Sequence, residues 1–357
     1  MKLAIPVITV LISLVVGGLV ILFTGDNPID AYRALLQGAG VLQRENYPAF
    51  RNIFTDFMST LNQLTPLLFA ALAVATALKS GVLNIGVAGQ MLFGGFMATV
   101  IVGYSGITSL FVGLPLALLV AAFFGGLLGA FIGFLKYRFN VNEVVSSIMT
   151  NFIVMHIVSF FINSRYLDFM TRQSREINPY TRLTLANTTF EELGLRMDIP
   201  LGLVVALVAC CLIWFMFAKT KIGFELRAVG LNKEAARYAG INVGGRIVLA
   251  MFLSGVLAGM AGATYYLGLF ASIPPRVLPS LGFDGIAVSL LGANNPFAII
   301  LAALVITIVN AGSGFMQATA GVPQEIAAVI TGTILLFSAC SMYIGSYIKG
   351  MFKWTRS

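Results

Sequence analysis

Long apolar runs recur along almost the whole of this 357-residue chain, and few polar tracts separate them. A helix of about 20 apolar residues crosses the ~30 Å hydrocarbon core of a bilayer. Only 10% of the residues are charged and 58% are hydrophobic, which leaves too little polar surface for a soluble globule. The pattern therefore predicts an all-α integral membrane protein, a polytopic bundle of about ten transmembrane helices in which residues 1–357 form a single transmembrane domain.

The apolar runs predict ten spans. The first resembles a signal peptide, but its run is long and no A-x-A cleavage site follows it, so it is predicted to be retained. The eighth and ninth runs are short, which predicts half-helices or a re-entrant hairpin. The predicted spans are Ala4–Phe23, Leu61–Leu78, Val82–Val102, Leu110–Leu135, Val144–Ile162, Pro200–Phe217, Ile247–Leu269, Leu281–Leu291, Pro296–Val309 and Ile326–Ile348.

The basic residues orient these spans, because Lys and Arg accumulate in cytoplasmic loops. Ten crossings place every short basic loop on one side and make both termini cytoplasmic. The loop 163–198 is then external and the loop 219–246 cytoplasmic, while the polar segment Asn27–Ser59 is predicted to lie on the outer membrane surface or rim. The net charge of +8 is explained by these orientation signals, so nucleic acid is not an expected partner.

The loop 219–246 is unusually charged, with six basic and two acidic residues between apolar flanks. Within it, Lys233–Gly240 predicts a short helix with Ala235, Ala236, Ala239 and Gly240 on one small-residue face. Such a face can enter the cleft of a partner closely. A cytoplasmic anchor explains the basic residues equally well, and the loop alone leaves both interpretations open.

No G-x-x-x-x-G-K-[ST] phosphate loop occurs in the chain, so any ATP chemistry is expected on a partner and no enzymatic activity on this chain. The single histidine, His156, cannot form a metal cluster by itself. It is predicted to be a packed, hydrogen-bonded side chain within the fifth span, and no metal site is predicted.

Two glycine-rich elements begin spans of opposite direction, the third and the eighth. The first carries Asn84 and Gln90, whose amides either hydrogen-bond a neighbouring helix or line a polar pathway. The second carries Asp284, for which helix capping at a structural hinge is preferred to direct contact with a solute. Their opposite directions would suit an inverted repeat.

The fifth span opens with Asn142 as a predicted N-cap and Glu143 as a first-turn acid. A polar stripe follows, made of Ser146, Ser147, Thr150 and Asn151 at helical spacing. Such a stripe either joins helices or lines a pathway.

Four ordered motifs carry a resemblance to a known family. They are NIGVAGQMLFGG at 84–95, VNEVVSSIMTNFI at 141–153, RAVGLNKEAARYAGINV at 227–243 and GFDGIAVSLLGANNP at 282–296. Together they resemble the permease subunits of bacterial ABC importers for nucleosides, within the ribose and branched-chain amino acid permease superfamily. The chain is most similar to the longer of two paired permeases.

The resemblance implies a complex in the bacterial cell membrane. Its other members would be a second permease subunit, a cytoplasmic ABC ATPase that binds ATP and Mg, and an external substrate-binding lipoprotein. This chain would bind no cofactor itself and would supply half of the pathway, with Asn84, Gln90, Asn151 and Asp284 as pathway residues. A permease for a simple sugar such as ribose is the alternative within the family, and a secondary transporter or channel without an ATPase is the alternative outside it.

The resemblance also assigns docking regions. Glu234, Ala235, Ala236 and Gly240 match the EAA-x-x-x-G coupling signature, although its further Ile and Leu-Pro are missing, and Arg227 opens the same motif. These five residues are the predicted contact with the ATPase. The external arginines are either a dock for acidic patches on the binding protein or solvated charges, namely Arg165, Arg172, Arg175, Arg182 and Arg196.

Overall fold

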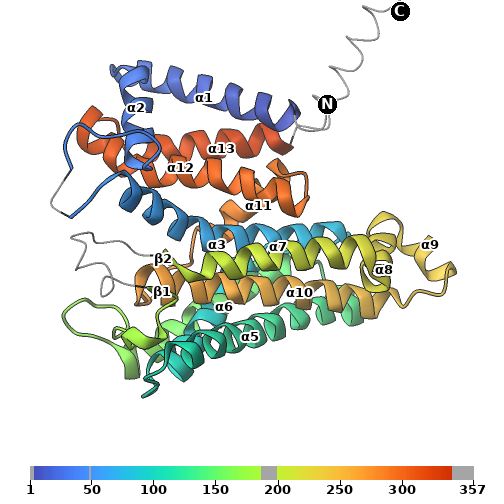
Figure 1. Cartoon of the computed structure of the whole chain (residues 1–357). Helices are drawn as coiled ribbons and strands as arrows, with labels where there is room; N and C mark the ends of the chain where they lie inside the picture. The colour runs from blue at the N-terminus through green and yellow to red at the C-terminus, as the bar shows by residue number, and fades with distance from the viewer. Residues whose placement is uncertain (1–3, 48–49, 186–198, 340–357) are drawn as a thin grey trace, which may run out of the picture.

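The computed structural model describes residues 4–47, 50–185 and 199–339, and the described chain is an elongated helical bundle (Figure 1). Among the described residues, three π-helical segments continue helices α4, α6 and α10, and strand β1 pairs with β2 in antiparallel register. The helices are α1 Ala4–Thr24, α2 Pro28–Gly38, α3 Ile53–Lys79, α4 Val87–Ala98, α5 Leu110–Phe139, α6 Glu143–Phe161, α7 Leu201–Lys219, α8 Lys221–Leu231, α9 Lys233–Tyr238, α10 Val243–Ala263, α11 Leu281–Leu291, α12 Pro296–Ala320 and α13 Glu325–Ala339. The remaining elements are η1 Thr99–Gly103, η2 Ile162–Tyr166, η3 Pro179–Thr181, η5 Thr264–Phe270, β1 Thr184–Leu185 and β2 Ile199–Pro200.

The prediction of an all-α polytopic bundle is confirmed. Among the described residues, six helices are long and apolar enough to span a membrane, and the pair α1 and α2, bent by 117°, makes a seventh candidate. Three shorter apolar helices complete the set, at 87–103, 281–291 and 325–338. Each of the ten predicted spans therefore contains an apolar helix.

Two spans differ from their predicted lengths. The eighth is short as predicted, since α11 has 11 residues, but the ninth is not, because α12 extends over 25 residues to Gly321, which ends it in a left-handed conformation. The third span was predicted from Val82, yet helix α4 begins at Val87 and residues 82–85 have no regular structure. The last predicted residues of the tenth span, 340–348, lie outside the described residues.

The segment 27–59 was predicted to lie on the outer membrane surface or rim, and the structure shows that part of it packs into the bundle. Helix α2 buries Ala31, Ala34 and Leu35, and Gly312 of α12 lies so close to Leu35 that a Cβ there would overlap the Leu35 carbonyl. Residues 53–59 already form the first turns of α3. Small residues at both contact faces allow this close packing, which polarity alone did not reveal.

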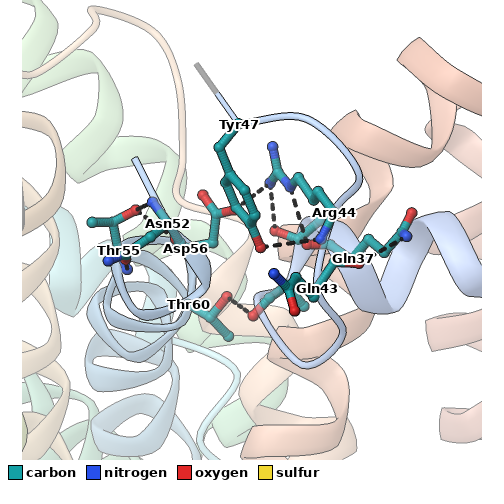
Figure 2. Close-up of polar contacts among 10 residues, drawn as sticks. Gln37, Gln43, Arg44, Tyr47, Asn52, Thr55, Asp56 and Thr60 are labelled. Atoms are coloured by element: carbon teal, nitrogen blue, oxygen red, sulfur yellow. Dashed lines mark hydrogen bonds and ion pairs between the residues drawn. The ribbon is translucent and has the colours of Figure 1, made fainter. Parts of the chain in front are cut away.

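A buried ion pair fixes the polar segment after α2 to α3 (Figure 2). The Arg44 guanidinium lies 2.9 Å from Asp56, donates to the carbonyl oxygens of Gln37 and Gly38, and stacks 4.0 Å from the ring centroid of Phe315. The pairing offsets part of the cost of removing both charges from water.

The end of the bundle that carries α8 and α9 (Figure 1) also holds the last turns of α3, α5 and α7, which carry Lys79, Lys136, Arg138 and Lys219. Lys136 at the end of α5 pairs with Glu143 at the start of α6, and Arg246 of α10 pairs with Glu225 of α8. Asn142 caps α6 as predicted, since its side chain accepts a hydrogen bond from the Val144 amide at 2.9 Å. The opposite end carries α2 and the β1–β2 hairpin.

Glycines bring α5 and α10 into backbone contact. Gly125 and Gly129 of α5 face Gly255 and Gly259 of α10, each spaced by four residues on one helical face. A Cβ on Gly259 would overlap the Ala121 carbonyl oxygen. This is small-residue packing of the kind that holds membrane helices together.

Gly259→Ala is expected to destabilise the bundle by about 1–3 kcal/mol, because the added methyl meets backbone that cannot move aside. Thermal unfolding in detergent measures the effect. Gly18→Ala in α1 is the matched control, since its Cβ would make only ordinary contacts, the nearest at 3.6 Å, and alanine favours the helix. Equal stability of the two variants would contradict the packing argument.

Candidate functional site

A cavity of about 700 Å³ lies among α3, η5, α11, α12 and α13. Its size falls within the ~300–1,000 Å³ typical of small-molecule sites. Aliphatic and aromatic side chains form most of the wall, and a few polar groups converge on it. The polar lining residues are Gln63, Ser280, Asp284, Thr307, Asn310 and Thr331, and the aromatic ones are Tyr265, Phe270 and Phe283.

Several polar groups of this cavity have no partner among the described residues. The hydroxyl oxygens of Thr307 and Thr331 are buried without a hydrogen bond. The side chains of Gln63 and Asn310 also make no hydrogen bond within the described chain. Buried polar groups are normally paired, so the two hydroxyls, with the half-buried amides of Gln63 and Asn310 beside them, are suited to bind a polar solute or water.

One wall of the cavity is aromatic. Tyr265 and Phe270 belong to η5, with ring centroids 4.8 Å apart and planes inclined at 58°. Both residues therefore lie in the π-helical segment that follows α10. The cavity thus combines a stacking surface with hydroxyl and amide groups.

Asp284 lines this cavity but does not cap α11. Ser280 holds the N-cap position, and Asp284 lies in the first turn, where its backbone amide donates to the Ser280 carbonyl. The capping interpretation was therefore wrong in its detail. The carboxylate is half-buried and faces the cavity instead.

Asn84 and Gln90 lie in a fully buried hydrogen-bond network beside α10. The Asn84 amide nitrogen donates to Gln90 Oε1 at 2.9 Å and to Ser254 Oγ at 2.8 Å, while its oxygen accepts from the Gly86 amide. Ser254 in turn donates to the Ala73 carbonyl of α3 at 2.7 Å. The network therefore joins α3, the start of α4 and α10.

Asn151 extends this network to α6. It accepts a hydrogen bond from the Gly89 amide at 2.9 Å and donates to the Ile85 carbonyl at 3.1 Å. The two glycine-rich elements also meet here, because a Cβ on Gly282 would lie 2.6 Å from the backbone of Ala88. In this conformation the amides of Asn84, Gln90 and Asn151 are occupied by protein groups, and their contact with a solute stays a prediction.

Asn84→Leu is expected to lower stability by about 1–3 kcal/mol, since it leaves the Gly86 amide, Gln90 and Ser254 without their partner in a buried setting. Thermal unfolding in detergent measures the structural role of Asn84, and the KM for solute uptake into proteoliposomes measures its contact with the solute. Gln317→Leu, which changes an exposed amide of α12, is the control. Unchanged stability with a raised KM would instead favour direct solute contact.

A second, strongly apolar groove of about 530 Å³ lies between α8 and α9. Arg227, Ala235 and Ala236 are among its lining residues, together with Phe224 and Leu231. Phe224 is 59% exposed and Leu231 is 88% exposed at the basic end of the bundle. An open apolar groove rimmed by charge is typical of a protein contact.

Helix α9 is shorter than the predicted segment 233–240. It ends at Tyr238, and Gly240 has a φ of 77°. The Gly240 amide donates to the Arg237 carbonyl and the Ile241 amide to the Ala236 carbonyl, which is a Schellman C-cap. Gly240 therefore ends the helix rather than extending a smooth face, and Glu234 lies exposed, 3.5 Å from Arg237.

His156 is exposed rather than packed. It lies within α6 among exposed apolar side chains, including Phe152, Ile153 and Ile157, and has no hydrogen bond or ion pair to any described residue. The prediction of a packed, hydrogen-bonded histidine was wrong, because spacing did not reveal which face of the helix is covered. Lipid tails offer no hydrogen-bond partner at this depth.

The external arginines that the structure describes differ in exposure. Arg165, Arg172 and Arg175 are exposed, Arg182 is half-buried, and Arg196 lies outside the described residues.

The described residues contain no group of three or more His, Cys, Asp or Glu side chains that could hold a metal.

Residues 57–339 match the family described as branched-chain amino acid transport system / permease component. The chain belongs to this permease family. It is therefore a multi-pass membrane transport subunit, which agrees with the apolar helices, the cavity and the exposed groove.

Relatives of this permease include nucleoside and sugar transport proteins. The guanosine ABC transporter permease protein NupP of Bacillus subtilis is 36% identical over 355 residues, covering 98% of this chain and 97% of the relative. The glucose ABC transporter permease protein TsgB13 of Haloferax volcanii is 28% identical over 97% of this chain and 89% of the relative. NupQ, also named a guanosine ABC transporter permease protein of B. subtilis, is 26% identical over 69% of this chain and 77% of the relative.

Sequence reasoning missed most of the cavity. Gln63, Thr307, Asn310 and Thr331 were not singled out, although each is a polar residue within or directly after an apolar run. Thr307 and Asn310 are three residues apart and so share one face of α12. That spacing was a usable signal for a polar face within the span.

Proposed function

We propose that this permease is a transmembrane subunit of an ATP-driven ABC importer for nucleosides and forms half of the solute pathway. The observation that carries the proposal is the cavity among α3, η5, α11, α12 and α13, with its unpaired hydroxyl and amide side chains beside two aromatic rings. A nucleoside presents a flat base for stacking and sugar hydroxyls for hydrogen bonds. The relation to NupP supports the same substrate class.

Within the pathway, Asp284 and the polar groups of α12 and α13 contact the solute in the cavity. Asp284 accepts hydrogen bonds from sugar hydroxyls or from donors of the base. Asn84, Gln90 and Asn151 keep the surrounding helices in register, and they reach the solute only if their network opens in another conformation.

The groove between α8 and α9 is the proposed contact with a cytoplasmic ABC ATPase. The chain lacks a phosphate loop, so ATP and Mg belong to that subunit. An apolar projection of the ATPase enters the groove beside Ala235 and Ala236, while Arg227 and Glu234 supply charge at the rim and Gly240 ends the helix sharply. A movement of the ATPase then displaces α8, and the Arg246–Glu225 ion pair transmits that displacement to α10.

The further proposed partners are a second permease and an external substrate-binding lipoprotein. His156 supports the second permease, since it has no partner among the described residues and another membrane-embedded protein would offer it a hydrogen bond that lipid tails cannot. The existence of both NupP and NupQ in one organism supports a distinct second chain.

The gathering of basic residues at the end where α1 begins and α13 ends supports cytoplasmic termini (Figure 1).

Uptake of labelled nucleoside by cells tests the proposal, with and without the gene for the ATPase subunit. Loss of uptake without the ATPase is expected, and unchanged uptake would favour a secondary transporter, for which the spans hold few ionisable residues. Excess unlabelled ribose or glucose tests the sugar alternative that TsgB13 represents. Competition by the sugars as strong as by nucleosides would contradict nucleoside specificity.

A further inference from the structure

One carboxylate lines the cavity among α3, η5, α11, α12 and α13. Among the described residues that form the wall, Asp284 carries the only formal charge, since the others are neutral. Its side chain is half-buried and makes no hydrogen bond or ion pair to any described residue. An ionised carboxylate accepts hydrogen bonds and donates none. The cavity therefore suits an uncharged ligand with N–H or O–H donors, and its unbalanced negative charge disfavours phosphates and other anions.

Aromatic side chains lie beside this carboxylate. Phe283 precedes Asp284 in α11 and also lines the cavity, and Tyr265 of η5 lies within electrostatic range of the Asp284 carboxylate. The rings of Tyr265 and Phe270 contact each other, as described above. A planar base that stacks on such rings keeps its polar atoms on its edge, so a carboxylate beside the rings is placed to meet that edge.

The neutral polar groups of the cavity come mainly from other elements. Gln63 belongs to α3, Thr307 and Asn310 belong to α12, and Thr331 belongs to α13. The hydroxyls of Thr307 and Thr331 are buried without a partner among the described residues. Hydroxyls and amides both donate and accept hydrogen bonds, so they match ribose hydroxyls, which do the same. The charged acceptor and these neutral groups thus belong to different elements of the wall.

We propose that Asp284 is a specificity-determining residue that selects nucleosides by the edge of the base. This inference rests on the proposed function and narrows the contact of Asp284 to the base. The base lies against Tyr265 and Phe270 with its edge toward Asp284, and the sugar lies among the neutral groups of α3, α12 and α13.

The hydrogen-bond donors of the base then decide the order of preference. Guanine presents two adjacent N–H donors on one edge, and a single carboxylate accepts both in a bidentate pair. Hypoxanthine presents only the ring N–H at the same place. Adenine and cytosine present an unprotonated ring nitrogen there, which leaves the carboxylate facing a lone pair. The expected order of affinity is guanosine, then inosine, then adenosine and cytidine.

Competition binding measures this order without the selectivity of a solute-binding protein. The assembled complex of permeases and ATPase is purified without that protein, and tritiated guanosine is displaced by unlabelled guanosine, inosine, adenosine, cytidine or guanosine monophosphate. Guanosine is expected to bind about tenfold more tightly than adenosine or cytidine, since a site built for N–H donors rejects an analogue that lacks them. Guanosine monophosphate is expected not to compete. Equal affinity for guanosine and adenosine, or no saturable binding of guanosine, would overturn the assignment.

Asp284→Asn separates contact with the base from contact with the sugar. Asparagine keeps the shape of the side chain, but its amide both donates and accepts, so it can pair with the ring nitrogen and the amino group of adenine. Guanosine is expected to lose about tenfold in affinity, because charge-assisted hydrogen bonds are roughly twice as strong as neutral ones. Adenosine is expected to gain affinity, which misfolding cannot cause. An equal loss for all nucleosides would assign Asp284 to the sugar and refute the inference.

Glu325→Gln is the matched control for this variant. Glu325 is an exposed carboxylate of α13 that does not line the cavity, so its variant is expected to keep the wild-type order of affinities. ATP-dependent uptake of guanosine and adenosine into proteoliposomes, with the solute-binding protein added, tests the proposed function separately. Absence of uptake by the wild-type transporter would refute the proposed function, whereas uptake together with binding that ignores the base would refute this inference alone.

Discussion

Ala235→Trp is expected to abolish co-purification of the ATPase subunit while the permease still inserts and folds. Ala235 is exposed and lines the groove between α8 and α9, so an indole there fills the space that the ATPase would enter without disturbing the buried core. A clash in the fully packed centre of an interface removes most of its affinity. Pull-down from detergent-solubilised membranes with a tag on the permease measures the loss, and size-exclusion chromatography reports folding.

Lys233→Trp is the matched control for this experiment. Lys233 lies on the same helix and is also exposed, but it does not line the groove. The control variant is expected to retain the ATPase. Normal pull-down by the Ala235 variant, or equal loss from both variants, would contradict the assignment of the groove.

Asn310→Leu is expected to raise the KM for nucleoside uptake by about tenfold or more. Leucine has the same number and branching of side-chain heavy atoms as asparagine but lacks the amide, which has no partner among the described residues, so a bound solute would lose its hydrogen bonds to that amide. A loss of ~1.4 kcal/mol corresponds to a factor of ten in affinity. Concentration-dependent uptake into proteoliposomes containing the complete transporter measures the change.

The control for Asn310 is Thr319→Val on the same helix. Thr319 is exposed near the end of α12 and does not line the cavity. Its variant is expected to keep the wild-type KM. An unchanged KM in the Asn310 variant would exclude that side chain from the solute site and would move the site away from this face of α12.

Much of the fold was predictable because hydrocarbon imposes a simple rule on sequence. An apolar helix was found in each of the ten predicted spans, since only long apolar segments with internally satisfied backbone can cross a bilayer. Helix α2 was not predicted, because its position depends on close packing against Gly312 of α12. The C-terminal part of α12 was not predicted. Its Ala, Gly and Ser residues continue the helix because the neighbouring elements tolerate small side chains.

The candidate site was less predictable, because polar residues within spans serve two purposes that look alike in sequence. Asn84 and Asn310 are both amides in apolar surroundings, yet Asn84 is occupied by Gln90 and Ser254 while Asn310 faces the cavity. Ser254 is 170 residues from Asn84 in the chain, so no local pattern could have paired them. The prediction placed Asp284 correctly near a helix start, but only the packing of the helices showed that its side chain faces the cavity.

The sequence by itself determined that this chain is a multi-pass permease with a charged loop at one end, because hydropathy, charge and family motifs are properties of segments. Only the tertiary structure decided which polar groups are free, that Gly240 ends α9, and that His156 faces outward. The physical reason is that hydrogen-bond partners and exposed faces depend on which helices pack together, and that choice is made by close contacts between residues far apart in the chain.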